Sequence, residues 1–141
     1  CFRMGGHRHS CTQRRAWAAS DGYKRQVAVF GGNDLVDGAA RVVLGPQDHR
    51  FTAEAVQRLV TTPFALTEGF DRMGVRLDGP LLDLDAALSI PSEPIVRGSV
   101  QVAGDGVATV LLADHQTTGG YPKIATVVGA DLDAFCQLRP G

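Results

Sequence analysis

The polar stretch from residue 114 to residue 123 holds the side chains best suited to chemistry. It reads Asp-His-Gln-Thr-Thr-Gly-Gly-Tyr-Pro-Lys and lies between two apolar runs. Gly119 and Gly120 permit positive φ, which would let backbone N–H groups face an anion as a nest, with Lys123 as the adjacent cation. Such a loop could hold a carboxylate or a phosphate. A wide hairpin loop, whose Thr and Gln side chains only satisfy the backbone, accounts for the pattern as well.

A second chemical candidate is the turn Asp71-Arg72-Met73-Gly74. Asp71 could act as a general base, and Arg72 could bind an anion through two parallel hydrogen bonds. Spacing alone favours a plainer interpretation, because adjacent opposite charges on a turn are more often simply solvated. Both polar stretches follow predicted strands. We therefore expect them to converge at one rim of the fold, with Lys123 or Arg72 facing a pocket.

Other catalytic and ligand-binding signatures are absent from the sequence. It contains no Walker A loop, no Gly-x-Gly-x-x-Gly and no Gly-x-Ser-x-Gly elbow. Cys1, Cys11 and Cys136 have none of the spacings of a disulfide framework. His7, His9 and Cys11 could contribute to a zinc site, but no fourth ligand is in reach. No metal site is predicted.

Short apolar runs separated by Gly and Pro turns must position these groups, and they predict a mostly β barrel rather than a βαβ sheet. Thr52 is expected to cap a helix over residues 53–60 that Pro63 ends. Its apolar face is expected to comprise Ala53, Val56, Leu59 and Val60. A short closing helix is expected over 131–138, and a loop or single helical turn over 81–88. The expected strands are 27–30, 40–44, 64–67, 75–77, 95–102, 109–113 and 124–128.

The segment Gly104-Asp105-Gly106 is expected to join two of these strands. Asp-Gly tolerates the positive φ of a type I′ turn, so the pattern indicates a tight hairpin.

Length and charge set the domain organisation. The chain has 141 residues and a formal net charge of -1, which favours one globular domain and argues against general nucleic-acid or membrane binding. Residues 1–26 are rich in Arg, His, Gly and Ser and lack periodic patterning, so we expect a basic segment that is disordered or non-native. No apolar run approaches the roughly 20 residues that span a bilayer. A cytoplasmic location is expected.

Several blocks of the sequence resemble the second half of the allophanate hydrolase subunit 2 family, a biotin-dependent carboxyltransferase-like family that includes a subunit of 5-oxoprolinase. The resemblance covers about residues 41–141. Its blocks are Gly45-Pro46-Gln47, Arg50-Phe51-Thr52, Asp71-Arg72-Met73-Gly74, Ser92-Glu93, Gly98-Ser99-Val100-Gln101-Val102, Gln116-Thr117-Thr118-Gly119-Gly120-Tyr121-Pro122-Lys123, Asp131-Leu132 and Gln137-Leu138-Arg139-Pro140-Gly141.

The resemblance implies a cyclophilin-like β barrel, incomplete over residues 27–141, in a protein that acts with a subunit 1 partner. It implies a fragment of ATP-dependent 5-oxoprolinase, which converts 5-oxo-L-proline to L-glutamate. One alternative is the carboxyltransferase part of a urea carboxylase system, with biotin carried on a partner. Another is a non-enzymatic regulator that binds a kinase-inhibitor partner.

The expected site follows from the two polar stretches together with this resemblance. Arg72 and Lys123 would contact an anion, and Asp71 or Asp114 would act as base or orienting carboxylate. The small amide or lactam substrate would contact Met73, Gln101, Gln116, Thr117, Thr118, Gly119, Gly120, Tyr121 and Pro122.

Overall fold

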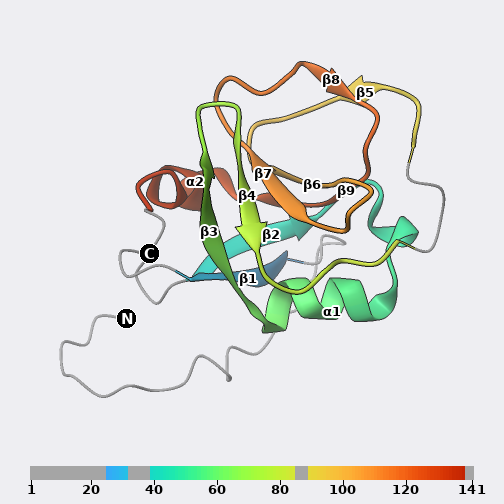
Figure 1. The fold of residues 1–141 in the computed structure, drawn as a ribbon, viewed down its shortest axis with the longest axis horizontal. Helices are drawn as coiled ribbons and strands as arrows, with labels where there is room; N and C mark the ends of the chain where they lie inside the picture. The colour runs from blue at the N-terminus through green and yellow to red at the C-terminus, as the bar shows by residue number, and fades with distance from the viewer. Residues whose placement is uncertain (1–24, 32–38, 85–88, 139–141) are drawn as a thin grey trace.

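The computed structural model of the chain describes residues 25–31, 39–84 and 89–138 (Figure 1). The basic segment expected over residues 1–26 lies outside this part except for its last two residues, which begin the first strand. Part of the loop expected over residues 81–88 also lies outside it. In the described part of that loop, Leu84 forms an isolated bridge with Phe51.

Seven strands form a barrel whose neighbours follow the order β1-β2-β9-β6-β7-β4-β3. Its pairs are antiparallel except at the seam, where β1 and β3 pair in parallel through three residue pairs. The strands are β1 (Arg25–Gly31), β2 (Ala39–Leu44), β3 (Pro63–Phe70), β4 (Gly74–Asp78), β6 (Ser99–Val102), β7 (Ala108–Leu111) and β9 (Lys123–Val127).

A second, two-stranded layer lies outside the barrel (Figure 1). It pairs β5 (Glu93–Pro94) with β8 (Thr118–Gly119). The remaining elements are the 3-10 turn η2 (Asp48–Arg50), α1 (Ala53–Thr61) and α2 (Gly129–Phe135). The predicted mostly β barrel with one or two short helices is confirmed. That the complete domain holds further strands stays a prediction.

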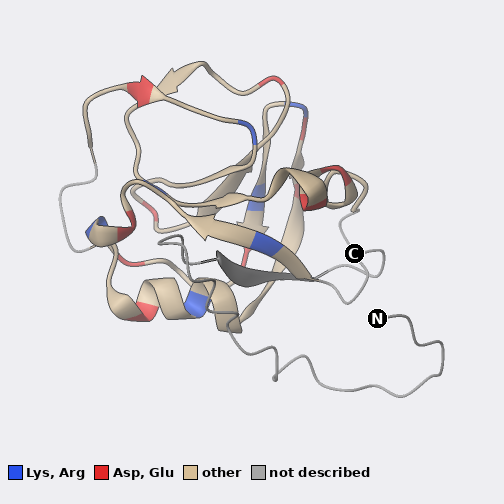
Figure 2. Ribbon diagram, turned by 180° about the vertical axis from the view of Figure 1, so that it is seen from behind, with Lys and Arg blue, Asp and Glu red and all other residues tan. Residues whose placement is uncertain are grey.

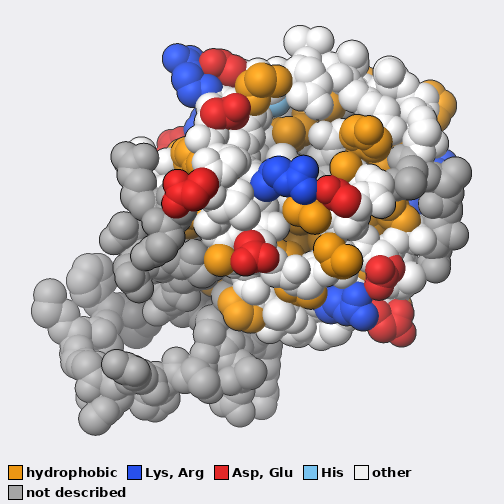
Figure 3. Space-filling model, viewed as in Figure 1, with side chains coloured by type: hydrophobic (Ala, Val, Ile, Leu, Met, Phe, Trp, Pro, Cys, Tyr) orange, Lys and Arg blue, Asp and Glu red, His pale blue; other side chains and the backbone are white. Residues whose placement is uncertain are grey.

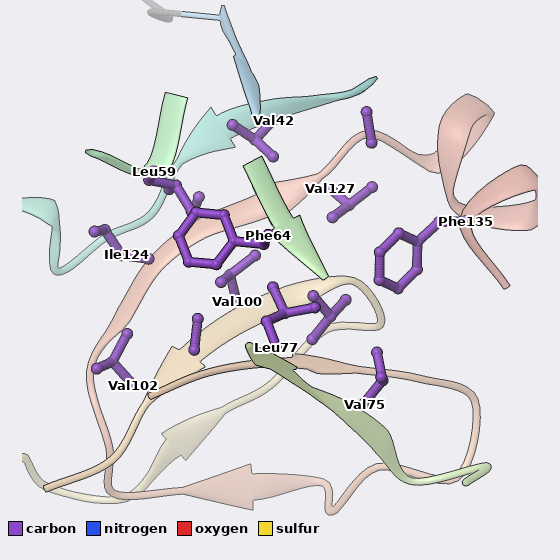
Figure 4. Packing of buried hydrophobic residues seen from close by; sticks show 14 of the residues in the cluster. Val42, Leu59, Phe64, Val75, Leu77, Val100, Val102, Ile124, Val127 and Phe135 are labelled. Carbon is purple, nitrogen blue, oxygen red and sulfur yellow. The ribbon is translucent and has the colours of Figure 1, made fainter. Parts of the chain in front are cut away.

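The core fills the barrel interior with alternate residues of its strands (Figure 4). Val75 and Leu77 point inward from β4, and Val100 and Val102 point inward from β6. Each such side chain contributes about 1.5–3 kcal/mol when fully buried. The intervening residues must face outward, because side chains alternate along a strand. Polar residues at those outward positions can therefore form a site on the barrel wall.

Helix α1 begins as the sequence predicts. Thr52 is its N-cap, and its hydroxyl oxygen accepts a hydrogen bond of 3.0 Å from the N–H of Ala55. Pro63 begins β3 directly afterwards. The predicted apolar face is partly wrong, since Ala53 is exposed and the fully buried positions are Ala55 and Leu59. These two residues lie four apart, so they occupy one helical stripe that faces the barrel.

The predicted tight hairpin at Gly104-Asp105-Gly106 is a longer connection over residues 103–107. The N–H of Gly106 donates to the carbonyl of Ala103 at 3.0 Å, and Gly106 has φ +72°. The Asp105 carboxylate accepts from the N–H of Val107 at 3.1 Å and pairs with Arg76 at 2.7 Å. One positive-φ glycine after a turn replaces the two-residue turn that Asp-Gly suggests.

An ion pair joins α2 to β2. Both oxygens of Asp131 accept hydrogen bonds from the Arg41 side chain, at 2.6 and 2.9 Å, and the Arg41 N–H adds another at 2.8 Å. These bonds lower the pKa of the Asp131 carboxyl. In the described residues, no helix is long and apolar enough to cross a membrane.

Candidate functional site

The two polar stretches singled out in the sequence meet at one rim of the barrel. Arg72 Nε lies 2.8 Å from Asp114 Oδ2, and Arg72 Nη2 donates to Asp114 Oδ1 at 3.1 Å. The Asp114 N–H donates to the Arg72 carbonyl at 2.8 Å. The Arg72 side chain is nevertheless 82% exposed. Its charge therefore joins two loops in water rather than facing a pocket.

The Asp71 carboxylate closes its own turn. Its Oδ1 accepts hydrogen bonds from the N–H groups of Met73, at 2.7 Å, and Gly74, at 3.0 Å. A short Asp side chain that bonds to the backbone two and three residues on is typical of a turn. This geometry gives Asp71 a structural task.

The predicted anion nest at Gly119 and Gly120 is not formed. Neither residue is among the described glycines with positive φ, which are Gly98 and Gly106. Gly119 instead belongs to β8, where it pairs with Glu93. A Cβ on Gly119 would stand 2.6 Å from Ile95 Cδ1, so close packing explains this glycine. The Gly120 carbonyl accepts the Ile90 N–H at 2.9 Å, which ties the loop to the segment before β5.

Lys123 lies in a buried polar cluster that also contains Gln47 and Glu93. Lys123 is 4% exposed, and its Nζ lies 3.4 Å from Glu93 Oε2. Gln47 Nε2 donates to the same Glu93 oxygen at 2.6 Å, and Gln47 Oε1 accepts the Lys123 N–H at 3.2 Å. The amide of Gln47 thus fixes both partners. An ammonium group has three donors, and this one long contact leaves hydrogen-bonding capacity on Lys123 Nζ.

A bulge in β9 aims Lys123 outward. The ladder pairs Val100 with Ala125 and then Gln101 with Lys123, so Ile124 is an extra residue on β9. Ile124 and Ala125 can therefore both join the core, and Lys123 stands beside Gln101 on the outer wall. Bulges commonly re-aim side chains next to functional sites.

A row of outward polar residues crosses four neighbouring strands. The registers pair Arg76 with Thr109, Thr109 with Gln101, and Gln101 with Lys123. Residues paired across a ladder point to the same face of a sheet. We call these four residues the outer-wall row. It carries a cation at each end, and Glu93 and Asp105 balance those charges.

A cleft of about 400 Å³ covers one end of the outer-wall row. Arg76 and Thr109 line it with Leu111 and Phe70. Three residues of the predicted site, Asp71, Met73 and Gln116, line it as well. Lys123 and Arg72 do not line it. Gln116 Nε2 is 3.5 Å from Gln101 Oε1, which places the Gln116 side chain between the cleft and the buried half of the row.

The buried half of the row has unmet hydrogen-bonding capacity. Gln101 is 6% exposed, and its Nε2 has no partner among the described residues. Ser99, two residues earlier on β6, is 1% exposed, and its Oγ also lacks a partner there. Buried polar groups are nearly always paired, so two unpaired groups on one strand mark a place where a ligand or ordered water binds.

The remaining predicted contact residues lie in different parts of the fold. The Thr117 carbonyl accepts the Ile95 N–H at 3.0 Å, and Thr118 pairs with Pro94 in the β5–β8 ladder. The Pro122 carbonyl accepts the Val102 N–H at 3.0 Å. Tyr121 is 48% exposed and Met73 is 52% exposed. Thr117 and Thr118 thus hold the second layer together, Pro122 joins the loop to β6, and Tyr121 and Met73 are exposed.

Sequence reasoning missed Gln47, Glu93 and Ser99 as site residues. Gln47 and Glu93 belong to the blocks that carry the family resemblance. Gln47 follows a Gly-Pro turn and Glu93 lies between two prolines, so each could equally be an ordinary polar loop residue. The pattern that could have indicated the site is Ser99-Val100-Gln101-Val102, in which polar residues alternate with valines and therefore share one face of a strand.

Charges of both signs are mixed over the described surface. Acidic and basic residues occur on strands, helices and loops (Figure 2), and both signs are interspersed with apolar side chains on the face drawn in Figure 3. No single-sign field dominates the described part of that face. Groups of three or more His, Cys, Asp or Glu side chains that could hold a metal are absent from the described residues.

The fold and the site together define a mostly β barrel domain that carries a row of polar residues on its outer wall, with a two-stranded layer outside the barrel. Residues 11–141 match the family model described as carboxyltransferase domain, subdomain A and B. The chain belongs to this family. The match begins inside the segment over residues 1–26, which the sequence alone left unmatched.

Two curated relatives both carry the name of the same 5-oxoprolinase subunit. The one from Haemophilus influenzae is 50% identical over 78 residues, which are 55% of this chain and 25% of the relative. The one from Escherichia coli is 36% identical over 101 residues, which are 72% of this chain and 33% of the relative. The chain thus spans about a quarter to a third of the length of these relatives.

Solved structures show the same fold. A crystal structure of a protein named TTHA0988 is 40% identical, with a TM-score of 0.60, and the match covers 71% of this chain and 19% of that one. The urea amidolyase of Kluyveromyces lactis is 23% identical, with a TM-score of 0.66 over 71% of this chain and 7% of that one. At this identity the second likeness shows the fold alone.

Proposed function

We propose that this chain is part of a subunit of ATP-dependent 5-oxoprolinase, which opens 5-oxo-L-proline to L-glutamate. The observation that carries the proposal is the buried, unpaired Nε2 of Gln101, which stands beside Lys123 and whose Oε1 contacts Gln116, a residue that lines the cleft. The names of the two curated relatives support the choice of substrate. A lactam is a neutral amide, and its carbonyl oxygen is an acceptor that suits two converging N–H donors.

The chemistry that these residues could perform is stabilisation of a developing oxyanion. Gln101 Nε2 and Lys123 Nζ would donate to the lactam oxygen while water adds to the carbonyl carbon and the C–N bond breaks. The departing nitrogen takes a proton and becomes the amine of glutamate. Donors fixed in a water-poor site are effective because they need no reorganisation during the reaction.

Glu93 replaces Asp71 and Asp114 as our candidate for the carboxylate that moves the proton. Asp71 lines the cleft, but its Oδ1 accepts two backbone hydrogen bonds in its own turn, and Asp114 is paired with the exposed Arg72. Glu93 stands beside Lys123, is held by Gln47 at 2.6 Å and keeps 43% of its side chain exposed. A carboxylate that is both fixed and hydrated can accept a proton from water.

ATP does not fit the described residues of this chain. Nucleotide phosphates are commonly held by a cradle of backbone N–H groups, and Gly119 and Gly120, the best candidates in sequence, lie in or beside a strand with their backbones engaged. We therefore derive no step through ATP from these residues. In the complete assembly, a partner subunit or another part of the chain would hold the nucleotide.

The test is the 5-oxoproline-dependent hydrolysis of ATP, with glutamate measured as the second product, by the complete protein with its partner subunits. Gln101→Leu should lower kcat/KM about 30-fold or more, because it removes a donor to the developing charge. Gln57→Leu, on the exposed face of α1, is the matched control and should change kcat/KM less than about 2-fold. Absence of turnover by the wild-type assembly would refute the proposal.

Carboxyl transfer to urea or a related amide is the second candidate. It is favoured by the description of the matching family model as a carboxyltransferase domain. Urea is also a neutral amide, so the same two donors would serve it. Carboxylation of urea by the complete assembly with a biotin-carrying partner, without 5-oxoproline turnover, would favour this function over the first.

A further inference from the structure

Ser99 and Gln101 share an unusual property within the described residues. Both are at least nine-tenths buried, and both have a side-chain polar atom without a hydrogen-bond partner, Oγ in Ser99 and Nε2 in Gln101. An unpaired buried donor is costly, because it has lost its water without gaining a substitute. No other buried side-chain nitrogen or oxygen in the described part of the chain is in this position.

The two groups point the same way from one strand. Val100 and Val102 of β6 face the core, so Ser99 and Gln101 face the outer wall. Positions two apart on a strand are separated by about 7 Å. The strand therefore holds one hydroxyl and one amide at a fixed separation on the same face.

The open cleft lies one strand away from this pair. Thr109 and Leu111 of β7 line the cleft. Thr109 pairs with Gln101, and the Leu111 carbonyl accepts the N–H of Gly98, the neighbour of Ser99, at 2.7 Å. Gln116 stands between, exposed and held to Gln101 only by a 3.5 Å contact. Gln116 therefore both lines the cleft and contacts Gln101, and the route to the pair that we infer passes its side chain.

We propose that Ser99 and Gln101 form a two-point strip that selects a small molecule with two acceptors, an amide carbonyl and a carboxylate. This rests on the proposed function, in which Gln101 already contacts the lactam carbonyl. The hydroxyl of Ser99 donates to the carboxylate of the same molecule. Lys123 is not the carboxylate contact, because in the proposed function its ammonium donates to the lactam oxygen, at the other end of the same molecule.

Two small molecules separate the two contacts. 5-Oxoproline carries the lactam and the carboxylate, whereas pyrrolidin-2-one carries the lactam alone. Ser99→Ala should weaken 5-oxoproline binding about 10-fold, since a hydrogen bond to a charged group is lost, and should leave pyrrolidin-2-one binding unchanged. Titration calorimetry on the complete protein with its partner subunits measures both dissociation constants.

The matched control is Thr61→Ala, which removes a hydroxyl that already has a partner, the Gln57 carbonyl at 2.8 Å, on the remote helix α1. It should change neither dissociation constant. A Ser99 that only holds ordered water predicts a lower thermal midpoint for Ser99→Ala with both constants unchanged, and that result overturns the strip.

Failure of the strip and failure of the proposed function give different results. A wild-type assembly that turns over 5-oxoproline, with a Ser99→Ala variant of unchanged affinity or of equally reduced affinity for both molecules, refutes the strip alone. A wild-type assembly that neither binds nor turns over 5-oxoproline refutes both.

Discussion

The molecule holds two charge pairs that look alike in composition and differ in their surroundings. At the rim, Arg72 and Asp114 are 2.8 Å apart, and Arg72 is 82% exposed. On the barrel wall, Lys123 and Glu93 are 3.4 Å apart, and the Lys123 side chain is 5% exposed. The rim pair has the better geometry, but water competes for both partners. An exposed pair of this kind contributes about 0–1 kcal/mol.

The difference teaches that unmet bonding capacity marks a site better than a short distance does. The rim pair is satisfied by itself and by water. Lys123, Glu93, Gln47 and Gln101 on the barrel wall are called the wall cluster. It keeps a buried cation with one long contact beside an amide nitrogen, Gln101 Nε2, that has no partner among the described residues. The first region joins two loops, and the second retains donors that a ligand can use. The following changes test this contrast, in order of expected effect.

The largest effect on stability is expected from Gly45→Ala, because the added Cβ would clash with the backbone of Lys123, which belongs to the wall cluster. A Cβ there would lie 2.2 Å from the Lys123 carbonyl oxygen, so β9 would have to move. We expect a loss of about 3 kcal/mol in stability, measured by urea unfolding of the complete protein. Gly129→Ala is the control, because its Cβ meets nothing within 4 Å. Equal stability of the two variants would contradict the close packing.

Gln47→Leu should have the next largest effect. It removes the hydrogen bonds to Glu93 and to the buried N–H of Lys123, leaving that N–H unpaired. The expected loss is about 2 kcal/mol in the same unfolding measurement. Gln57→Leu on the exposed side of α1 should cost less than about 0.5 kcal/mol. If the two Gln variants unfold alike, Gln47 does not hold the cluster.

Removal of the Arg41–Asp131 pair should have an intermediate effect on stability, with a definite pH dependence. The hydrogen bonds that Asp131 accepts from Arg41 place the folded-state pKa of Asp131 below the unfolded value. Its stabilisation is thus fully present above the unfolded pKa and is lost as pH falls through the folded pKa. Asp131→Asn should cost about 1–2 kcal/mol at neutral pH and progressively less in acid.

Thermal midpoints recorded from neutral pH down to about pH 3 check this dependence. Asp133→Asn is the control, because Asp133 is 84% exposed and its pair with Arg97 is solvated. A constant difference between wild type and Asp131→Asn across this range would contradict the assigned role of Asp131.

The smallest effect is expected at the rim. Asp114→Asn leaves the backbone bond between the two loops intact and removes only a solvated ion pair. Stability should fall by less than about 0.5 kcal/mol, and 5-oxoproline turnover by less than about 2-fold. A loss of activity comparable to that of Gln101→Leu would move the catalytic site to the rim.

Sequence predicted well what depends on neighbouring residues. The Thr52 cap, the stop at Pro63 and the alternating strands follow from local rules, and they appear in the structure. The convergence of the two polar loops followed from their positions after strands. Lys123 and Gln101 were among the predicted residues, although as separate contacts.

The rest depends on register between distant strands, which no local pattern reveals. The extra residue Ile124 turns Lys123 outward next to Gln101, and Gln47 reaches it from 76 positions away. The expected nest at Gly119 and Gly120 failed for a related reason. Gly119 pairs with Glu93 in the β5–β8 ladder and packs closely on Ile95, and local sequence cannot distinguish a closely packed strand glycine from one with positive φ.

The most direct test compares the same substitution in the two regions. Lys123→Met and Arg72→Met each remove a cation and keep an unbranched side chain, and kcat/KM for 5-oxoproline-dependent ATP hydrolysis is measured on the complete protein with its partner subunits. We predict a loss of about 100-fold or more for Lys123→Met and less than about 3-fold for Arg72→Met. Equal losses, or a larger loss for Arg72→Met, would contradict the assignment of the site to the barrel wall.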